Sequence, residues 1–239
     1  MGRAYEVRKM SIQKTGAIKA KTYSLYSKEI YLAARGNPDI DANINLKRMI
    51  VKAKSNQVPN DIIDRAITKA KGASTDDYLI MHYEVFGPGT STLIIKCLTD
   101  NVNRAISLIR AAFNKCDAKL GVQNSVSYSY DNLGILSFKT KESEKILDVL
   151  IENGIDAIDF EEDDGVLTIS VLPQNMHHLK DAIEKAVPNI EYEIDEIGYY
   201  AKDRVILEGE DLELFNRLIK MLDEIEDVSE VYHNVELTF

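Results

Sequence analysis

The sequence predicts an α+β protein with three domains, a helical one at the N-terminus followed by two ferredoxin-like α/β domains, one inserted in the other. Apolar residues at helical spacing fill residues 17–72. From residue 77 onward, short runs rich in β-branched and aromatic residues alternate with amphipathic stretches. The predicted domains are residues 1–76, residues 77–133 plus 201–239, and residues 134–200.

Three short helices are expected in the first domain. The first covers residues 17–34 and ends before Gly36-Asn37-Pro38. We expect Asp41 to cap the second, whose inner face carries Leu46, Met49, Ile50 and Ala53. The third begins at Pro59-Asn60-Asp61 and stops at Gly72.

The next segment contains a hairpin and a helix but is incomplete by itself. The turn Gly87-Pro88-Gly89 lies between two predicted strands, and a helix over residues 101–114 and a strand over residues 126–130 follow. The missing pieces stand at the end of the chain. The expected elements of this split domain are strands 83–86, 92–98, 126–130, 205–207 and 231–235, and helices 101–114 and 212–225.

Residues 134–200 contain a complete βαββαβ order, which is that of a ferredoxin-like domain. An acidic turn over Glu161–Gly165 separates its second and third strands. The expected strands are 135–138, 158–160, 166–171 and 192–197, and the expected helices are 142–153 and 175–186.

Charge is distributed unevenly along the chain, whose formal net charge is -10. Residues 1–72 hold 15 Lys and Arg against 6 Asp and Glu, a net +9, whereas residues 140–239 hold 8 against 27, a net -19. A basic end attracts polyanions and an acidic end repels them, so we expect nucleic acid to bind the N-terminal domain. The alternative is that these basic residues are solvated or balance the acidic half within the molecule. The candidate nucleic-acid-binding residues are Arg3, Arg8, Lys9, Lys14, Lys19, Lys21, Lys47, Arg48, Lys52, Lys54, Arg65 and Lys69.

No arrangement for catalysis, a cofactor or a metal is found. The four histidines have no metal-ligand spacing, and the calcium-like run from Asp39 has Ile44 where the tight turn needs Gly. Cys97 and Cys116 lack a partner that would activate them, so we expect buried or idle thiols. The longest apolar run, residues 30–34, cannot span a bilayer, and we expect a cytoplasmic protein with no membrane contact.

Two polar segments allow two interpretations each. The acidic helix end at Asp223, Glu224, Glu226 and Asp227 is either a solvated face or a surface that contacts a basic protein partner or screens nucleic acid from the C-terminal half. The segment 100–104 is either a helix cap, with Asp or Asn accepting free N–H groups, or a polar surface loop that exposes Arg104.

Several blocks, in order, resemble the YebC family of proposed transcriptional regulators, whose mitochondrial relatives act as translational activators. The resemblance implies a helical domain, two α/β domains and no enzymatic activity. The chain has Gly2-Arg3-Ala4-Tyr5 where the family usually has His-Ser-Lys-Trp, which is typical of a divergent, YeeN-like subgroup. The blocks are residues 36–39, 46–48, 59–67, 83–89, 98–104 and 125–128.

The function expected from these observations is that of a non-enzymatic, DNA-binding regulator of gene expression without a small-molecule substrate. The alternative is a translation factor that binds ribosomal RNA on the ribosome through the same basic helices.

Overall fold

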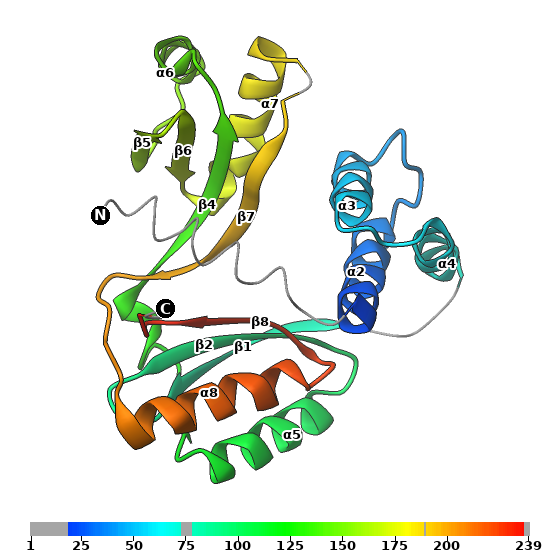
Figure 1. Cartoon of the computed structure of the whole chain (residues 1–239). Helices are drawn as coiled ribbons and strands as arrows, with labels where there is room; N and C mark the ends of the chain where they lie inside the picture. The colour runs from blue at the N-terminus through cyan, green and yellow to red at the C-terminus, as the bar shows by residue number, and fades with distance from the viewer. Residues whose placement is uncertain (1–18, 73–77, 189, 237–239) are drawn as a thin grey trace. The chain divides into compact units, whose positions relative to one another are not determined.

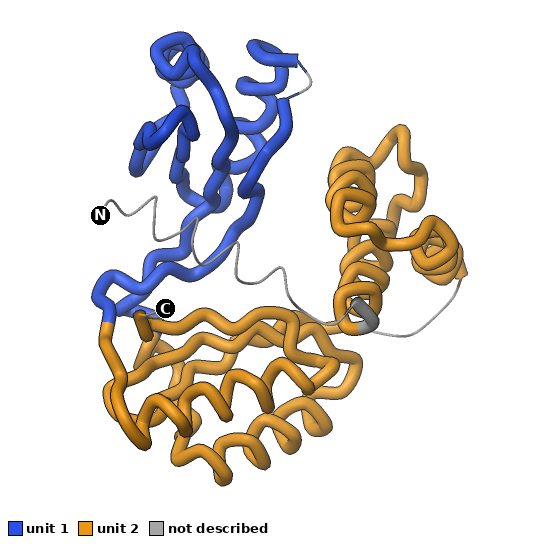
Figure 2. The backbone as a smooth tube through the Cα atoms, in the orientation of Figure 1, with its two compact units in different colours: residues 1–16, 127–204 blue, residues 17–126, 205–239 orange. Residues whose placement is uncertain are grey.

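The computed structural model describes residues 19–72, 78–188 and 190–236. The chain divides after Val126 and after Arg204 into two compact units, shown in Figure 2. The described part of unit 1 consists of residues 127–188 and 190–204, and the described part of unit 2 consists of residues 19–72, 78–126 and 205–236. The α+β class predicted from the sequence is confirmed, with three helices at the N-terminal end and two four-stranded antiparallel sheets that carry helices. The three domain ranges remain a prediction.

The helical part of unit 2 consists of α2 (Lys19–Ala34), α3 (Ile44–Ser55) and α4 (Asn60–Lys71), close to the predicted positions. Every helix contributes buried residues to one core, which explains the helical spacing of apolar residues in the sequence. The buried members of this core are Ile30, Ala34, Leu46, Ile50, Ala53, Val58, Ile63, Ala66 and Ile67.

The predicted cap of α3 was wrong by two residues. Asn43 is the cap, because its backbone is extended and its side-chain oxygen accepts the backbone N–H of Leu46 at 3.0 Å. Asp41 belongs to the preceding turn, where its own N–H donates to the carboxylate of Asp39 at 3.0 Å. The polar side chains of the calcium-like segment that begins at Asp39 therefore stabilise a turn before α3.

The sheet of unit 2 has the strand order β3-β1-β2-β8. The predicted hairpin is confirmed as β1 (Leu79–Phe86) and β2 (Thr92–Thr99), which pair antiparallel. β3 (Lys119–Leu120) pairs with β1, and β8 (Val228–His233) pairs with β2 after the chain has passed through unit 1. Figure 1 shows α5 (Val102–Lys115) and α8 (Gly209–Asp223) together on one face of this sheet, where they share its apolar core.

Two strands predicted for this sheet are absent from the described residues. In place of a strand over 126–130, the 3-10 turn η1 covers Ser127–Ser129, because the N–H groups of Asn124 and Val126 donate to the carboxylate of Glu84 instead of to a neighbouring strand. The predicted strand 205–207 is reduced to one parallel bridge between Val205 and Val235.

Unit 1 has the predicted βαββαβ order and the strand order β5-β6-β4-β7, all antiparallel, which is the ferredoxin-like arrangement. The acidic turn is narrower than predicted, because β5 continues to Asp163 and only Asp164 and Gly165 adopt positive φ. The elements are β4 (Tyr130–Lys139), α6 (Ser143–Glu152), β5 (Asp159–Asp163), β6 (Val166–Val171), η2 (Pro173–Asn175), α7 (Met176–Ala186) and β7 (Tyr192–Ala201).

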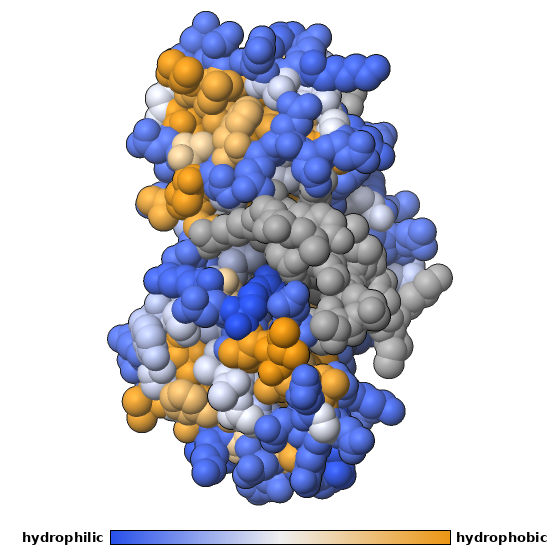
Figure 3. All heavy atoms as spheres, turned by 60° about the vertical axis from the view of Figure 1, so that its left-hand side comes forward, coloured by the Kyte–Doolittle hydropathy of each residue, from blue (hydrophilic) through white to orange (hydrophobic). Residues whose placement is uncertain are grey.

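Large hydrophobic side chains remain exposed in both units, among them Val122 at 77% and Ile151 at 69%. Figure 3 shows hydrophobic patches among hydrophilic residues on the side that it presents. Much of any protein surface is apolar, so such residues alone do not mark a site. Among the described helices, none is long and apolar enough to cross a membrane.

Candidate nucleic-acid interface

Helix α3 carries the densest group of predicted nucleic-acid-binding residues. Its twelve residues include Lys47, Arg48, Lys52 and Lys54 and no acidic residue. Lys52 and Lys54 lie in the last turn, where cations also stabilise the negative end of the helix dipole. All charged side chains of this helix are therefore positive.

The burial pattern of α3 separates an inner face from an outer face. Leu46, Ile50 and Ala53 are buried in the helical core, which leaves the opposite face to solvent. That outer face carries Ile44, Lys47, Val51 and Lys54, at spacings of three or four residues, and Ile44 and Val51 are 64% and 63% exposed. Two ammonium groups thus alternate with two exposed apolar side chains. These four residues are called the α3 outer face below.

Two basic residues of α4, Arg65 and Lys69, already have partners within the chain. The guanidinium of Arg65 forms an ion pair with Asp61 one turn earlier. The ammonium of Lys69 lies 5.5 Å and 5.4 Å from the ring centroids of Tyr31 and Tyr78, which are cation–π distances. Both basic side chains remain on the surface, but each is less available to a phosphate than those of the α3 outer face.

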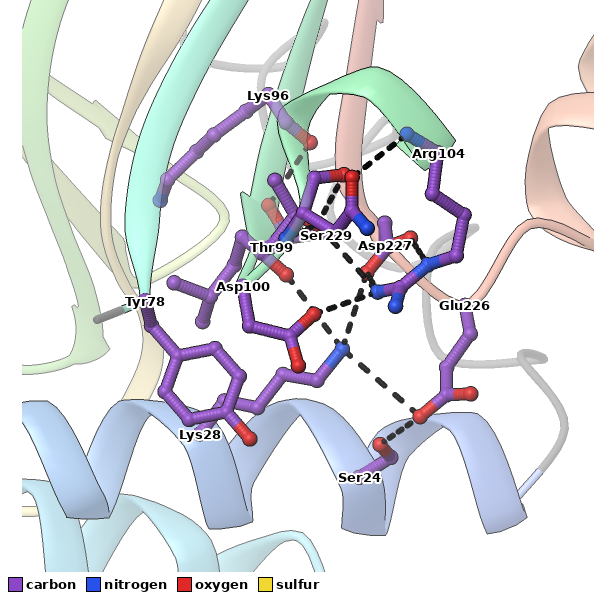
Figure 4. A network of polar contacts seen from close by, with 12 residues as sticks. Ser24, Lys28, Tyr78, Lys96, Thr99, Asp100, Arg104, Glu226, Asp227 and Ser229 are labelled. Carbon is purple, nitrogen blue, oxygen red and sulfur yellow. Dashed lines mark hydrogen bonds and ion pairs between the residues drawn. The ribbon is translucent and has the colours of Figure 1, made fainter. Parts of the chain in front are cut away.

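The basic residues of α2 face the acidic end of α8. The ammonium of Lys21 donates to the carbonyl of Asp223 at 2.7 Å, and burial lowers the pKa of Lys21 although the charge of Asp223 opposes this. One turn on, the hydroxyl of Ser24 donates to Glu226 at 2.7 Å. The ammonium of Lys28 lies 3.6 Å from Asp227 and 3.8 Å from Glu226. Figure 4 shows Lys28 and Ser24 reaching from α2 toward these carboxylates.

Asp227 is the centre of this polar network. Its side chain is 3% exposed and receives two hydrogen bonds from Arg104, Nε to Oδ2 at 3.0 Å and Nη2 to Oδ1 at 2.7 Å. Burial alone would raise the pKa of Asp227, but hydrogen bonds from Arg104 and Thr99 and the charge of Lys28 hold it below its ordinary value. The carboxylate is therefore negatively charged at neutral pH, and it joins Lys28 of α2 to Arg104 of α5.

The segment 100–104 is a helix cap, and the side chain of Arg104 forms ion pairs within the chain. The side chain of Asn101 accepts the backbone N–H of Arg104 at 3.0 Å, which confirms the cap at the start of α5. The side chain of Arg104 is 47% exposed, but it binds Asp100 at 2.7 Å as well as Asp227. Both interpretations of the segment thus describe part of the structure.

The structure separates the predicted site residues into groups. Helix α3 carries Lys47, Arg48, Lys52 and Lys54, and helix α4 carries Arg65 and Lys69. Lys21 of α2 faces the acidic end of α8 at Asp223. Lys19 is the first residue of α2, and Arg3, Arg8, Lys9 and Lys14 lie outside the described residues. Sequence reasoning missed the roles of Lys28 and Asp227, because no local pattern pairs segments about 200 residues apart.

The thiols of the chain are buried, as expected. Burial raises the pKa of Cys97 to about 12, so its nucleophilic thiolate is essentially absent at neutral pH. In the described part of the chain, no group of three or more His, Cys, Asp or Glu side chains could hold a metal ion.

Glu29 is a half-buried carboxylate of α2 near charged groups of α3, β2 and β8. Burial raises its pKa, while Lys52 and Lys96 act in the opposite direction and Glu230 adds to the rise. A raised folded-state pKa contributes stability below the unfolded value of 4.5, and this contribution is lost as the pH rises through the folded value. At neutral pH the charged form of Glu29 therefore costs stability.

Replacing Glu29 by Gln is expected to raise the stability of unit 2 at pH 7 by about 1 kcal/mol, a rise of roughly 2–4 °C in its thermal midpoint. The gain should disappear near pH 4, where the wild-type carboxyl group is neutral as well. Thermal unfolding at pH 4 and pH 7 measures both values, with Glu213→Gln, an exposed residue of α8, as the matched control. A variant that is less stable at pH 7 would show that Lys52 and Lys96 outweigh the burial of Glu29.

Comparisons with known proteins cover nearly the whole chain. A family model described as the TACO1/YebC protein N-terminal domain matches residues 3–73, and one described as the TACO1/YebC second and third domain matches residues 78–235. A probable transcriptional regulatory protein of Marinobacter nauticus is 41% identical over 99% of both chains. One from Vibrio parahaemolyticus is 42% identical over 99% of this chain and 100% of its own.

The fold also resembles a solved structure. The crystal structure of a conserved hypothetical protein from Aquifex aeolicus matches with a TM-score of 0.73 and 30% identity, covering 94% of this chain and 93% of that one. Matches to both family models, together with full-length identities near 40%, confirm the resemblance indicated by the sequence. The chain belongs to the TACO1/YebC family of probable transcriptional regulators, which is non-enzymatic.

Proposed function

We propose that this chain regulates gene expression by binding nucleic acid through the helical part of unit 2, with α3 as the principal contact. The observation that carries the proposal is the α3 outer face, where Lys47 and Lys54 project from a helix that has no acidic residue. Arg48 and Lys52 flank this face, and Arg3, Arg8, Lys9 and Lys14 would add phosphate contacts from the N-terminal segment. The relatives' names support a role in transcription and therefore DNA as the target.

The side chains of α3 favour contacts with the phosphate backbone. A lysine ammonium is a point charge that attracts phosphates, whereas base reading relies on the paired hydrogen bonds of Arg, Asn or Gln. Three of the four basic residues of α3 are lysines, so we expect weak discrimination between sequences. This favours a target recognised by its backbone, and the same face would suit ribosomal RNA, the second candidate target. Membership of a YeeN-like subgroup remains a prediction.

Binding to duplex DNA is expected to be strongly dependent on salt. If about five phosphates are neutralised, log K should fall with log salt concentration at a slope of about -4 to -5. Fluorescence anisotropy on a random duplex, a promoter fragment and a ribosomal RNA fragment, each over a range of salt concentrations, measures this. A slope near zero would contradict phosphate contacts. A promoter bound about a thousandfold more tightly than random DNA would contradict weak specificity.

A further inference from the structure

The sheet of unit 1 has two buried faces, and the described helices account for only one. Residues opposite one another in neighbouring strands share a face. On the first face, Leu136 and Phe138 of β4 and Ile169 of β6 pack in one cluster with residues of α6 and α7 such as Ile146 and Leu179. These helices cover this face, as expected for a ferredoxin-like domain.

The second face is buried just as deeply. Ile135 and Ser137 of β4 are 0% exposed, and Thr168, paired with Ser137, is 2% exposed. The apolar cluster on this face consists of Leu133, Ile135, Ile194 and Tyr200, all from β4 and β7. Within unit 1, no described helix contributes to this cluster. Apolar strand residues at zero exposure require a cover, since water would otherwise reach them.

The rim of the second face is acidic. By register, Asp159, Glu161 and Asp163 of β5 share this face with Ser170, Thr168 and Val166 of β6, and Glu196 of β7 lies opposite Ile135. Lys139 of β4 also shares this face, opposite Val166, and its ammonium lies 3.4 Å from the carboxylate of Glu193. The face therefore combines an apolar centre with carboxylates, which suits a segment that is both basic and apolar.

We propose that residues 1–18 of this chain bind the second face of the unit 1 sheet. This N-terminal segment contains Arg3, Arg8, Lys9 and Lys14 against Glu6 alone, and between them the apolar side chains of Val7, Met10 and Ile12. Eighteen extended residues span about 60 Å, whereas a four-stranded sheet is about 15–20 Å wide. The segment is thus long enough to cross the sheet, and its charge is opposite to that of the rim.

This docking would restrain nucleic-acid binding. Arg3, Arg8, Lys9 and Lys14 cannot pair with the carboxylates of β5 and with phosphates at the same time. Nucleic acid therefore competes with the chain's own acidic strand for the segment. This regulatory consequence rests on the proposed function, whereas the docking itself does not.

Limited trypsin digestion of the full chain tests the docking, because cleavage after Arg8 and Lys9 reports how often the segment is released. The triple variant Asp159→Asn, Glu161→Gln, Asp163→Asn removes the rim charges while keeping side-chain size. We expect cleavage in the segment to become about tenfold faster, equivalent to about 1.4 kcal/mol. The matched control is Glu144→Gln, Asp148→Asn, Glu152→Gln on the exposed side of α6, which should cleave like the wild type.

Equal cleavage rates in the wild type and the triple variant would overturn the docking. Protection that grows with protein concentration would overturn it too, since the occupant would then be a second copy of the chain. An unchanged circular dichroism spectrum and thermal midpoint of unit 1 establish that the variant is folded. The triple variant should also bind duplex DNA at least about threefold more tightly. Equal DNA affinity would overturn the inhibitory role, and a wild type that binds no nucleic acid would count against the proposed function alone.

Discussion

Replacing Asp227 by Ala is expected to destabilise unit 2 by about 3 kcal/mol. Removing one partner of a buried ion pair costs about 3–5 kcal/mol, because the remaining charge stays buried without compensation. Lys28, whose side chain is 10% exposed, would keep the more distant contacts with Glu226 at 3.8 Å, the carbonyl of Leu98 at 3.5 Å and the ring centroid of Tyr78 at 6.0 Å. The lower end of the range applies because the side chain of Arg104 is 47% exposed and water can solvate it.

Urea unfolding followed by circular dichroism measures this loss, with Glu226→Gln as the control. The side chain of Glu226 is 70% exposed, so its variant should lose less than about 1 kcal/mol. Because the pKa of Asp227 is lowered, its contribution is fully present above the ordinary value of 3.8 and is lost as the pH falls through the folded value. The difference between wild type and variant should therefore be constant from pH 5 to pH 8. A variant as stable as the Glu226 control would show that the network contributes little.

Much of the fold was predictable because hydrophobic periodicity and turn residues act locally. Strand β6 (Val166–Val171) was predicted to the residue, since a short run of β-branched and apolar residues follows the turn at Gly165. Helix α4 (Asn60–Lys71) was predicted nearly as well, because Pro59 and Gly72 mark its ends. Such elements are determined by the spacing of apolar residues and by the backbone conformations that Pro and Gly prefer.

One error arose where a side chain from elsewhere in the fold decides the local structure, and another where two neighbouring residues could both cap a helix. The strand predicted over 126–130 fails because the carboxylate of Glu84, about 40 residues earlier, takes the N–H of Val126. The cap of α3 was misplaced because Asp41 and Asn43 are both good capping residues, and only the backbone at Asn43 is extended.

Counting charges in the sequence likewise does not show which basic residues of the candidate site are paired in the fold. The net +9 of residues 1–72 treats every basic residue as equally available, but Lys21 and Lys28 face Asp223, Glu226 and Asp227. Part of the positive charge is thus balanced within the molecule, as the alternative interpretation held. The acidic helix end is paired with Lys21 and Lys28 of α2 in the same chain. The candidate interface is consequently narrower than the sequence implied, and α3 becomes its centre.

The double variant Lys47→Glu, Lys54→Glu is expected to bind duplex DNA about 100-fold more weakly than the wild type near physiological salt. Each lysine lost removes one phosphate contact, and each glutamate adds repulsion, together about 3 kcal/mol. The salt slope should also become shallower by about 2, because two fewer counterions are released. Neither residue belongs to the helical core, so the variant should stay folded and lose only about 1 kcal/mol of stability, because Lys54→Glu places a negative charge at the negative end of the helix dipole.

The matched control is Lys119→Glu, Lys141→Glu, two exposed lysines outside the helical part, which makes the same change in net charge. Long-range repulsion alone would weaken both variants equally, whereas a contact at α3 weakens the first far more. Anisotropy titrations with DNA and with ribosomal RNA compare the two targets. Equal losses on both would indicate backbone contacts common to any nucleic acid, as the lysines of α3 imply. A double variant within about threefold of the control would place the site elsewhere, because reversing two charges at a phosphate contact cannot be neutral.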